Sequence, residues 1–228
     1  MISTIKNVRM LRHFILFIML ASCSTDVMSQ SEKYQRIMEE KLALMNRDNT
    51  AESWHELSNT FERIAEAEKT QWLPFYYAST CRVMKGYAIS SGRSGGFAAQ
   101  TDPEADKAEQ LLDKAQALTT ENSEILCIRK MIATLRMTAD PMVRFLKYGT
   151  IAADALKKAR QLDPDNPRTY LLEGQDKLFT PEQFGGSKIM AKELFRTALE
   201  KFENHKAPSS IHPHWGASQA RYLLEQAN

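Results

Sequence analysis

The stretch ALKKARQLDPDNPRTYLLEG, residues 155–174, joins two expected helices through a short turn. Leu156 and Ala159 lie three residues apart and therefore share one face of the first helix. Asn166 followed by Pro167 is a helix-start signal, because Asn caps a helix end and Pro is tolerated at the first helical position. The stretch therefore predicts a helix, a turn and a second helix that begins near Pro167.

The same order of small and large residues recurs along the chain. A small residue, a large one four positions later and a small one three after that share a helix face, so a neighbouring helix can approach closely. A turn then returns the chain as an antiparallel helix, and each hairpin needs a neighbour to cover its apolar face. We expect packing roles for Phe61, Ile64, Phe75, Ala108, Leu112, Ala115, Ala152, Leu156, Ala159, Ala191, Phe195 and Ala198.

Residues 152–174 resemble the junction between two tetratricopeptide repeats (TPR). Ala152, Leu156, Ala159 and Pro164 match the second helix and turn of one repeat, and Tyr170 and Gly174 match the large and small positions of the next first helix. The resemblance covers most of residues 31–203. It implies an all-α superhelix, or solenoid, of about four irregular hairpins plus a C-terminal capping helix. The chain also resembles small exported TPR proteins of bacterial cell envelopes.

The spacing departs from the regular TPR period of about 34 residues. The large residues Phe61, Leu112, Leu156 and Phe195 follow one another at 51, 44 and 39 residues. The extra residues fall between the two helices of a unit, at 91–103, near 141–150 and at FTPEQFGG. Glu173 also stands where the family usually has Leu, so the curvature and the groove of the family are not carried over.

Helical spacing of apolar residues extends over nearly the whole chain, and no segment alternates with a period of two. We expect helices at 33–46, 51–67, 72–90, 104–118, 123–137, 141–162, 167–179, 187–203 and 216–226.

Residues 1–30 have the three-part layout of a bacterial secretory signal. Basic residues precede the apolar run 14–21, which is shorter than the roughly 20 residues of a spanning helix. Two cleavages remain open: a signal peptide of residues 1–29, or one of residues 1–22 followed by a lipidated Cys23. We expect an exported protein of the periplasm or the outer-membrane side of the envelope, with one domain at 31–228. Membrane contact is expected only through the signal or a lipid anchor.

The formal net charge of +2 belongs to the leader. Cleavage before Gln30 removes three basic residues and one acidic residue, which leaves a neutral chain. A neutral chain without a basic cluster argues against nucleic acid as a partner, since phosphate contacts dominate that affinity. Cys81 and Cys127 lie on apolar helix faces, and we expect buried free thiols, with a disulfide as the alternative.

The motif Gly92-Arg-Ser94-Gly-Gly96 has the G-x-S-x-G pattern of a hydrolase nucleophile elbow. Such a serine follows a buried strand, whereas a helical pattern precedes Ser94. We expect a flexible loop here, with a catalytic Ser94 as the alternative.

The pair His212 and His214 could hold a transition metal, although no third ligand has suitable spacing. His55-Glu56 opens like a zincin motif, but Asn59 occupies the position of the second His. Surface histidines without metal are therefore the expectation, and a metal site at His212 and His214 is the alternative.

Aromatic residues cluster at Trp72, Phe75, Tyr76 and Tyr77. Tyr offers apolar area together with a hydroxyl, which suits peptide recognition. If the concave face of the superhelix is a binding site, Tyr76, Tyr77, Arg129 and Arg168 are the candidates, because they lie on the first helices of the units. A purely structural role in the core is the alternative.

The repeat pattern and the lack of a catalytic constellation favour a non-catalytic interaction module that binds a protein or peptide segment. We expect no cofactor and no enzymatic activity. The alternatives are an enzyme or metal-binding protein that uses Ser94 or His212 and His214, and a structural lipoprotein scaffold of the envelope.

Overall fold

The computed structural model describes residues 32–47, 49–93 and 95–227. The chain divides into two compact units, Met1–Ala43 and Leu44–Asn228, and the expected single domain at 31–228 stays a prediction. A helix at 32–45 lies largely in the first unit. The expected signal and the lipidation of Cys23 fall outside the described residues. Among the residues that are described, none of the helices combines the length and the apolar character needed to span a bilayer.

The second unit is helical throughout its described part, without a strand. The all-α prediction is therefore confirmed. Its elements in order are α2 (Ala51–Glu68), α3 (Trp72–Ser90), α4 (Ala98–Ala117), α5 (Ser123–Ala139), α6 (Pro141–Arg144), the π-helical turn η1 (Phe145–Gly149), α7 (Thr150–Leu162), α8 (Pro167–Phe179), the 3-10 turn η2 (Glu182–Phe184), α9 (Lys188–Asn204) and α10 (Ala217–Gln226).

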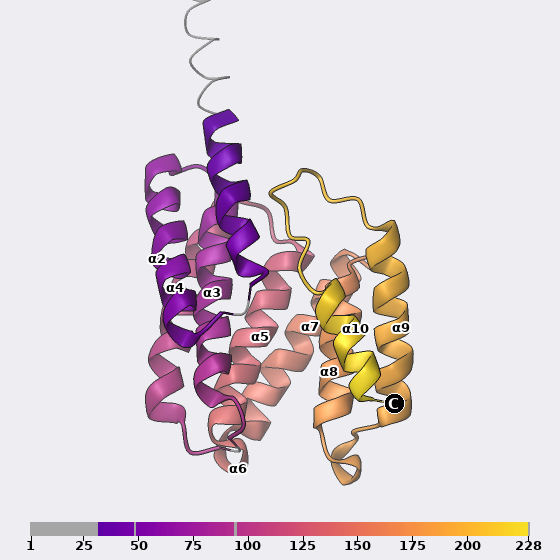
Figure 1. The fold of residues 1–228 in the computed structure, drawn as a ribbon. Helices are drawn as coiled ribbons and strands as arrows, with labels where there is room; N and C mark the ends of the chain where they lie inside the picture. Colours follow the sequence, from indigo (N-terminus) through magenta and orange to yellow (C-terminus); the bar gives the residue numbers. More distant parts are fainter. Residues whose placement is uncertain (1–31, 48, 94, 228) are drawn as a thin grey trace, which may run out of the picture. The chain divides into compact units, whose positions relative to one another are not determined.

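Helices that follow one another in sequence pack side by side (Figure 1). The most extensive contacts join α3 to α4 and α2, α8 to α9, and α5 to α7 and α4. Within the described residues, α2 makes no extensive contact with α9 or α10. The hairpins therefore form an open stack rather than a closed bundle, and membership of the TPR family itself stays a prediction.

Most of the expected packing residues are buried. Phe61, Phe75, Ala108, Leu112, Ala115, Ala152, Leu156, Ala159, Gly174, Ala191, Phe195 and Ala198 all lie in the interior. Three differ: Ile64 and Tyr170 are half-buried and Pro164 is exposed. On α2 the buried small residue is Ala65, one position after Ile64. Cys81 and Cys127 are buried free thiols, as expected.

Two helical glycines allow close approach of a neighbouring helix. A Cβ on Gly174 of α8 would lie 2.5 Å from the Phe195 ring of α9, and one on Gly86 of α3 would lie 2.4 Å from Leu135 of α5. Real Cβ atoms do not approach other heavy atoms so closely, so a glycine is required at both positions for the observed packing.

Two of the expected helices differ from the structure by more than two residues. α4 begins at Ala98, six residues before the expected start at 104, and it contains Pro103. Phe97 and Thr101 are buried there, so tertiary packing extends the helix past the proline signal. The expected helix 141–162 is interrupted by the π-helical turn η1, which takes up part of the extra residues that the spacing had indicated.

Candidate binding site between α7 and α8

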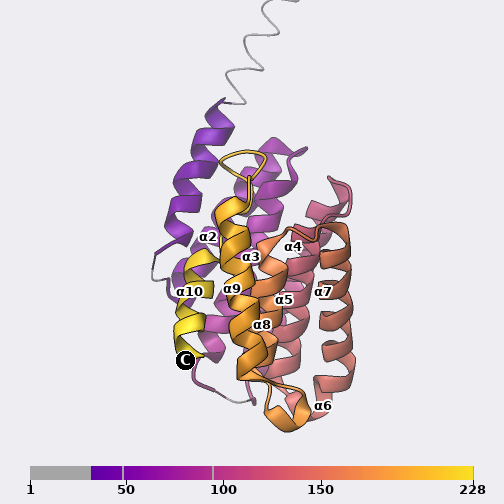
Figure 2. The ribbon, with the colours of Figure 1, turned by 90° about the vertical axis from the view of Figure 1, so that its right-hand side faces the viewer.

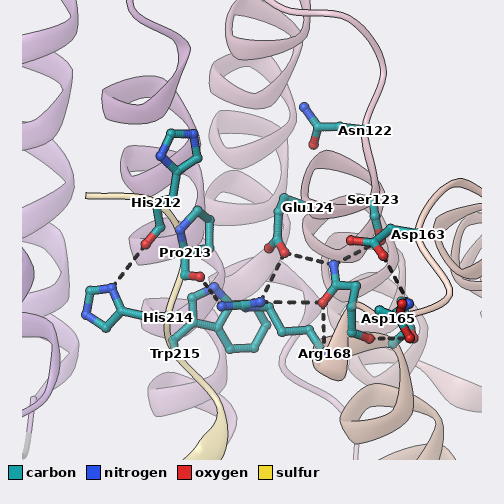
Figure 3. A network of polar contacts seen from close by, with 12 residues as sticks. Asn122, Ser123, Glu124, Asp163, Asp165, Arg168, His212, Pro213, His214 and Trp215 are labelled. Atoms are coloured by element: carbon teal, nitrogen blue, oxygen red, sulfur yellow. Dashed lines mark hydrogen bonds and ion pairs between the residues drawn. The ribbon is translucent and has the colours of Figure 1, made fainter. Parts of the chain in front are cut away.

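Arg168 of α8 is fully buried at the centre of a polar junction (Figure 3). Its guanidinium donates to the Glu124 carboxylate at the start of α5 (Nη1–Oε1 3.1 Å) and to the backbone oxygen of Pro213. The Trp215 ring centre lies 5.3 Å from the guanidinium carbon. The side chain is 0% exposed, so Arg168 joins parts of the fold and does not line an open groove as expected.

Tyr76 and Tyr77 of α3 are buried as well, at 0% and 1% exposure. Tyr76 donates to Glu124 Oε2 (3.2 Å) and accepts from Trp215 Nε1 (2.9 Å). Tyr77 donates to the backbone oxygen of Ile211 (2.8 Å). Both therefore hold residues 205–216, which link α9 to α10 and which we call the strap. Their expected place on an open concave face is corrected accordingly.

Glu124 is the acidic partner of this junction, and 16% of its side chain remains exposed. Burial raises the pKa of Glu124, whereas Arg168 and the hydrogen bonds from Tyr76 and Asn166 lower it. The burial of the Tyr76 phenol raises its pKa well above the ordinary value. The junction thus contains a charged pair whose removal from water is only partly offset.

Arg129 of α5, the fourth candidate, is half-buried and pairs with Asp113 of α4 (Nη2–Oδ1 3.0 Å). It lines a cavity of about 330 Å³ together with Tyr148 and Ile151. Its role in binding a partner stays a prediction.

Ser94, His212 and His214 are the residues on which the enzyme and metal alternatives depend. Ser94 lies outside the described residues, and the element before its loop is the helix α3 rather than a strand. His212 and His214 lie on the strap with their imidazoles well apart (Figure 3), and Nδ1 of His212 is 2.8 Å from Oγ of Ser209. The described residues contain no group of three or more His, Cys, Asp or Glu placed to hold a metal.

A pocket of about 410 Å³ lies beneath the strap. Trp72, His205 and His212 line it, and burial lowers the pKa of both histidines. Three carboxylate residues, Glu121, Glu124 and Asp163, line the same pocket. Glu121 pairs with Lys158 and Glu124 with Arg168. Among the described residues Asp163 forms no ion pair, and its negative charge disfavours an anionic ligand in this pocket. Another cavity, of about 580 Å³ beside α9, is lined by polar and charged residues only.

A cavity of about 620 Å³ lies between α7 and α8, and its lining includes Ala153, Leu156, Pro164 and Tyr170. Small-molecule sites usually measure ~300–1,000 Å³. We call this cavity the α7–α8 groove. Its lining consists of Ala153, Leu156, Lys157, Arg160, Gln161, Pro164, Tyr170, Glu173, Asp176 and Lys177.

A second hollow of about 200 Å³ continues the groove, and the two share Ala153, Asp176 and Lys177. We call this hollow the inner pocket. Its other lining residues are Thr134, Met137, Phe145, Gly149, Ala152, Thr180, Phe184 and Gly185. The π-helical turn η1 supplies Phe145 and Gly149, and the loop with η2 supplies Phe184 and Gly185.

The charges of the groove do not cancel. Its two carboxylates are paired, Glu173 with Arg160 and Asp176 with Lys130 of α5 (2.7 Å). Lys157 and Lys177 form no ion pair with any described residue, and Lys177 donates only to the backbone oxygen of Gly185. The groove therefore offers apolar side chains together with two lysines, Lys157 and Lys177, whose charges are not paired.

One polar atom of the inner pocket lacks a partner. Thr134 Oγ1 is buried and makes no hydrogen bond. A buried hydroxyl without a partner costs about 1–3 kcal/mol, so such atoms are rare unless water or a ligand completes them.

Sequence reasoning did not assign the groove residues. The signal that could have found them is the set of departures from the repeat spacing, since the region near 141–150 and the segment FTPEQFGG both line the inner pocket. The spacing alone indicates only that these segments are irregular insertions.

A comparison with solved structures finds the HusA haemophore from Porphyromonas gingivalis, with 32% sequence identity and a TM-score of 0.74. The match covers 86% of this chain and 92% of that chain. This chain belongs to the HusA family. No protein-family model matches the sequence, and a search of curated proteins finds no match.

The similarity to the HusA haemophore extends over most of the chain and is not confined to one hairpin. The two chains therefore share the overall helical fold. The relative comes from a bacterium, in agreement with the bacterial origin expected from the leader.

Proposed function

We propose that this chain is a non-enzymatic carrier that binds a haem-class tetrapyrrole in the α7–α8 groove. A haemophore is a haem carrier, and the HusA-family relative is named as one. The groove supports the proposal: it is a cleft of about 620 Å³ in which apolar surface from Ala153 and Leu156 lies beside charged side chains, and two of its lysines lack carboxylate partners. The tetrapyrrole would be cargo, in keeping with the expectation that the protein has no cofactor.

The chemistry of the ligand fits this lining. A haem-class tetrapyrrole is a flat apolar ring with two carboxylates on one edge. Ala153 and Leu156 offer apolar surface to the ring, and Phe145 and Phe184 add aromatic surface in the inner pocket. Lys157 and Lys177 can pair with the carboxylates without first breaking an ion pair.

The ring would be held mainly through its faces and its carboxylates. Histidine is absent from the lining of both cavities, and the side chains able to approach a haem iron there are Met137 and Tyr170. The Tyr170 hydroxyl already donates to the backbone oxygen of Pro164 (3.0 Å). Recognition thus relies on apolar contact and charge.

The test is a titration of the purified chain with haem and with metal-free protoporphyrin, followed by absorbance and by quenching of tryptophan fluorescence. Phe145→Ser together with Phe184→Ser removes two aromatic walls. Burial of one such ring contributes ~1.5–3 kcal/mol, so we expect the double variant to bind at least about tenfold more weakly.

The matched control is Tyr222→Ser, which removes an aromatic side chain that is 60% exposed on α10 and lines neither cavity. We expect its affinity to equal that of the parent chain. Full affinity of the Phe145/Phe184 variant, or loss of binding on substitution of His212 in the strap, would refute the groove as the site.

A protein or peptide segment is the second candidate ligand. The continuity of the groove with the inner pocket favours it, because together they run from Pro164 and Tyr170 to Phe184 and could hold an extended chain. This candidate predicts that a peptide array binds the parent chain and that protoporphyrin neither binds nor competes.

We propose export to the bacterial envelope as the setting for this carrier. The basic and apolar leader of residues 1–30 supports it. Recovery of the protein from the periplasm or outer-membrane fraction of its host tests the location, and a cytoplasmic pool alone would contradict it.

A further inference from the structure

Exposed apolar side chains gather in two segments of the second unit. Of the twelve large hydrophobic side chains that are exposed in the described chain, eight lie in α6, η1 and the region from the end of α8 to the start of α9. These are Met142, Val143, Phe145, Leu146, Phe179, Phe184, Ile189 and Met190. Single exposed hydrophobics are ordinary, but so strong a concentration indicates an interaction surface.

Both segments lie at the same end of the second unit, at the lower edge of the two views (Figures 1 and 2). Phe145 of η1 and Phe184 of η2 line one cavity, the inner pocket, so the segments meet there. We call this surface the apolar end. Met142 and Leu146 are 94% and 83% exposed, so their side chains protrude and do not lie in a concavity.

The apolar end is also basic. Residues 140–149 and 177–192 contain five Lys or Arg and two Asp or Glu, a local charge of +3 in a chain that is neutral after loss of the leader. Arg144 pairs with Asp102 (2.7 Å). The lysines of these segments, Lys147, Lys177, Lys188 and Lys192, form no ion pair with a described residue.

We propose that the apolar end docks on an anionic lipid membrane, with the tips of α6–η1 and of the η2 loop inserted among the headgroups. Protruding apolar side chains next to basic ones are the pattern of proteins that lie at a membrane interface. The cations are attracted by the negative surface of such a bilayer, while the hydrophobic tips enter it.

A protein partner fits this surface less well. Binding to a protein usually relies on anchors that fill pockets on both sides. The most exposed side chains of this end, Met142 and Leu146, line none of the described cavities and protrude instead. A second copy would also bring the same lysines together across a two-fold axis, and like charges repel there. A lipid surface needs no complementary pocket and supplies the opposite charge.

This docking goes beyond ligand binding, and it differs from the expectation that the membrane is touched only through the leader. It would orient the inner pocket toward the bilayer, because Phe145 and Phe184 belong both to that pocket and to the apolar end. An apolar cargo could then pass between groove and membrane without crossing bulk water.

The test is flotation of the purified, unlipidated chain with vesicles of phosphatidylcholine alone and with vesicles that contain phosphatidylglycerol. We expect binding to the anionic vesicles that weakens at high salt and falls at least about tenfold in Met142→Ser/Leu146→Ser. Tyr222→Ser, which removes an exposed aromatic side chain from α10, is the control and should bind as the parent does.

The double variant has a second measurement. Met142 and Leu146 line neither the groove nor the inner pocket, so its helical circular dichroism and its affinity for protoporphyrin should be unchanged. These two measurements separate loss of membrane docking from loss of fold. If the chain does not bind protoporphyrin, the flotation experiment still tests the docking.

Three outcomes would overturn the docking: no binding to anionic vesicles, equal binding by the double variant, or binding that is equally strong to neutral vesicles at all salt concentrations. Light scattering tests whether a second copy of the chain occupies the surface. If the parent chain does not bind vesicles but forms a dimer, and Met142→Ser/Leu146→Ser disrupts that dimer, the surface is an interface with a second copy instead.

Discussion

Arg168 is a charged side chain that the fold uses as an interior residue. Its guanidinium reaches Glu124 of α5 and Pro213 of the strap, and it lies 5.3 Å from the Trp215 ring centre. A buried pair of this kind adds little stability over apolar residues, but the loss of one partner leaves a charge without compensation. The main effect of this pair on stability is therefore expected when one of its two partners is removed.

Replacement of Arg168 by Met should destabilise the fold by about 3 kcal/mol at neutral pH, because Glu124 then loses its counter-charge. Burial already raises the pKa of Glu124, and Arg168 opposes that rise. A raised carboxyl pKa means that stability is greatest below the unfolded value and falls as pH rises through the folded value. The variant should thus lose more stability between pH 5 and 7.5 than the parent, as measured by urea unfolding at each pH.

The control for this prediction is Arg168→Met combined with Glu124→Gln, which removes the unpaired charge. We expect the double variant to recover part of the stability and to lose the extra pH dependence. A destabilisation by Arg168→Met that is the same at both pH values would contradict the electrostatic explanation.

Gly174 is a second residue on which a whole contact depends. Gly174→Ala would place a Cβ 2.5 Å from the Phe195 ring. Overpacking of this kind destabilises a fold by about 1–3 kcal/mol. The better helix propensity of Ala offsets at most about 1 kcal/mol of this loss. We expect a net loss of up to about 2 kcal/mol in the free energy of unfolding, measured by thermal unfolding.

Gly149→Ala is the control variant. Gly149 has helical backbone angles, and a Cβ there would lie 3.4 Å from Met137, which is an ordinary contact distance. This substitution should therefore be neutral or slightly stabilising.

At the scale of elements, the strap is the least regular part of the second unit, and side chains from α3 and α8 hold it. Tyr77 donates to the backbone of Ile211, and Tyr76 accepts from Trp215. Tyr77→Phe removes the first of these bonds with little change in shape, and one such bond contributes about 1 kcal/mol. We expect faster amide exchange within residues 205–216, with α2 to α5 unaffected.

An equal exchange rate in the strap of the parent and of Tyr77→Phe would show that the hydrogen bond to Ile211 does not hold it. Tyr222→Phe serves as the control, since Tyr222 is exposed on α10 and should leave the strap unchanged.

The helices were predictable because their apolar spacing and their end signals agree. α3 and α8 have the expected bounds, and the Asn122 and Asn166 side chains cap α5 and α8 as short polar residues do. The early start of α4 was not predictable, since it depends on the burial of Phe97 and Thr101 by distant parts of the chain. The π-helical turn carries no local sequence signal that separates it from an α-helix.

The candidate site was less predictable than the fold. Position on a first helix suggested Tyr76, Tyr77 and Arg168, yet the strap covers all three, and the strap has no periodicity from which its path could be inferred. The groove lies where α7 and α8 make few contacts with each other, so it depends on how the helices pack. The residues that line the groove therefore look ordinary in sequence.

At the scale of the whole second unit, the helices fall into two groups, α2 to α7 and α8 to α10. α8 packs closely on α9, and Leu171, Phe195 and Leu223 belong to a core of their own. Contacts of α8 with α5 and α7 are sparse, and ion pairs such as Lys130–Asp176 and Arg168–Glu124 bridge the junction. The α7–α8 groove lies at this junction, where incomplete packing leaves room for a ligand.

The measurement that tests this account most directly is a crystal structure of the chain in complex with protoporphyrin. The account predicts the ring between α7 and α8, with its faces on Leu156 and Phe184 and its carboxylates near Lys157 or Lys177. A ring bound beneath the strap against Trp72 and His212, or a chain that binds no porphyrin at all, would contradict it.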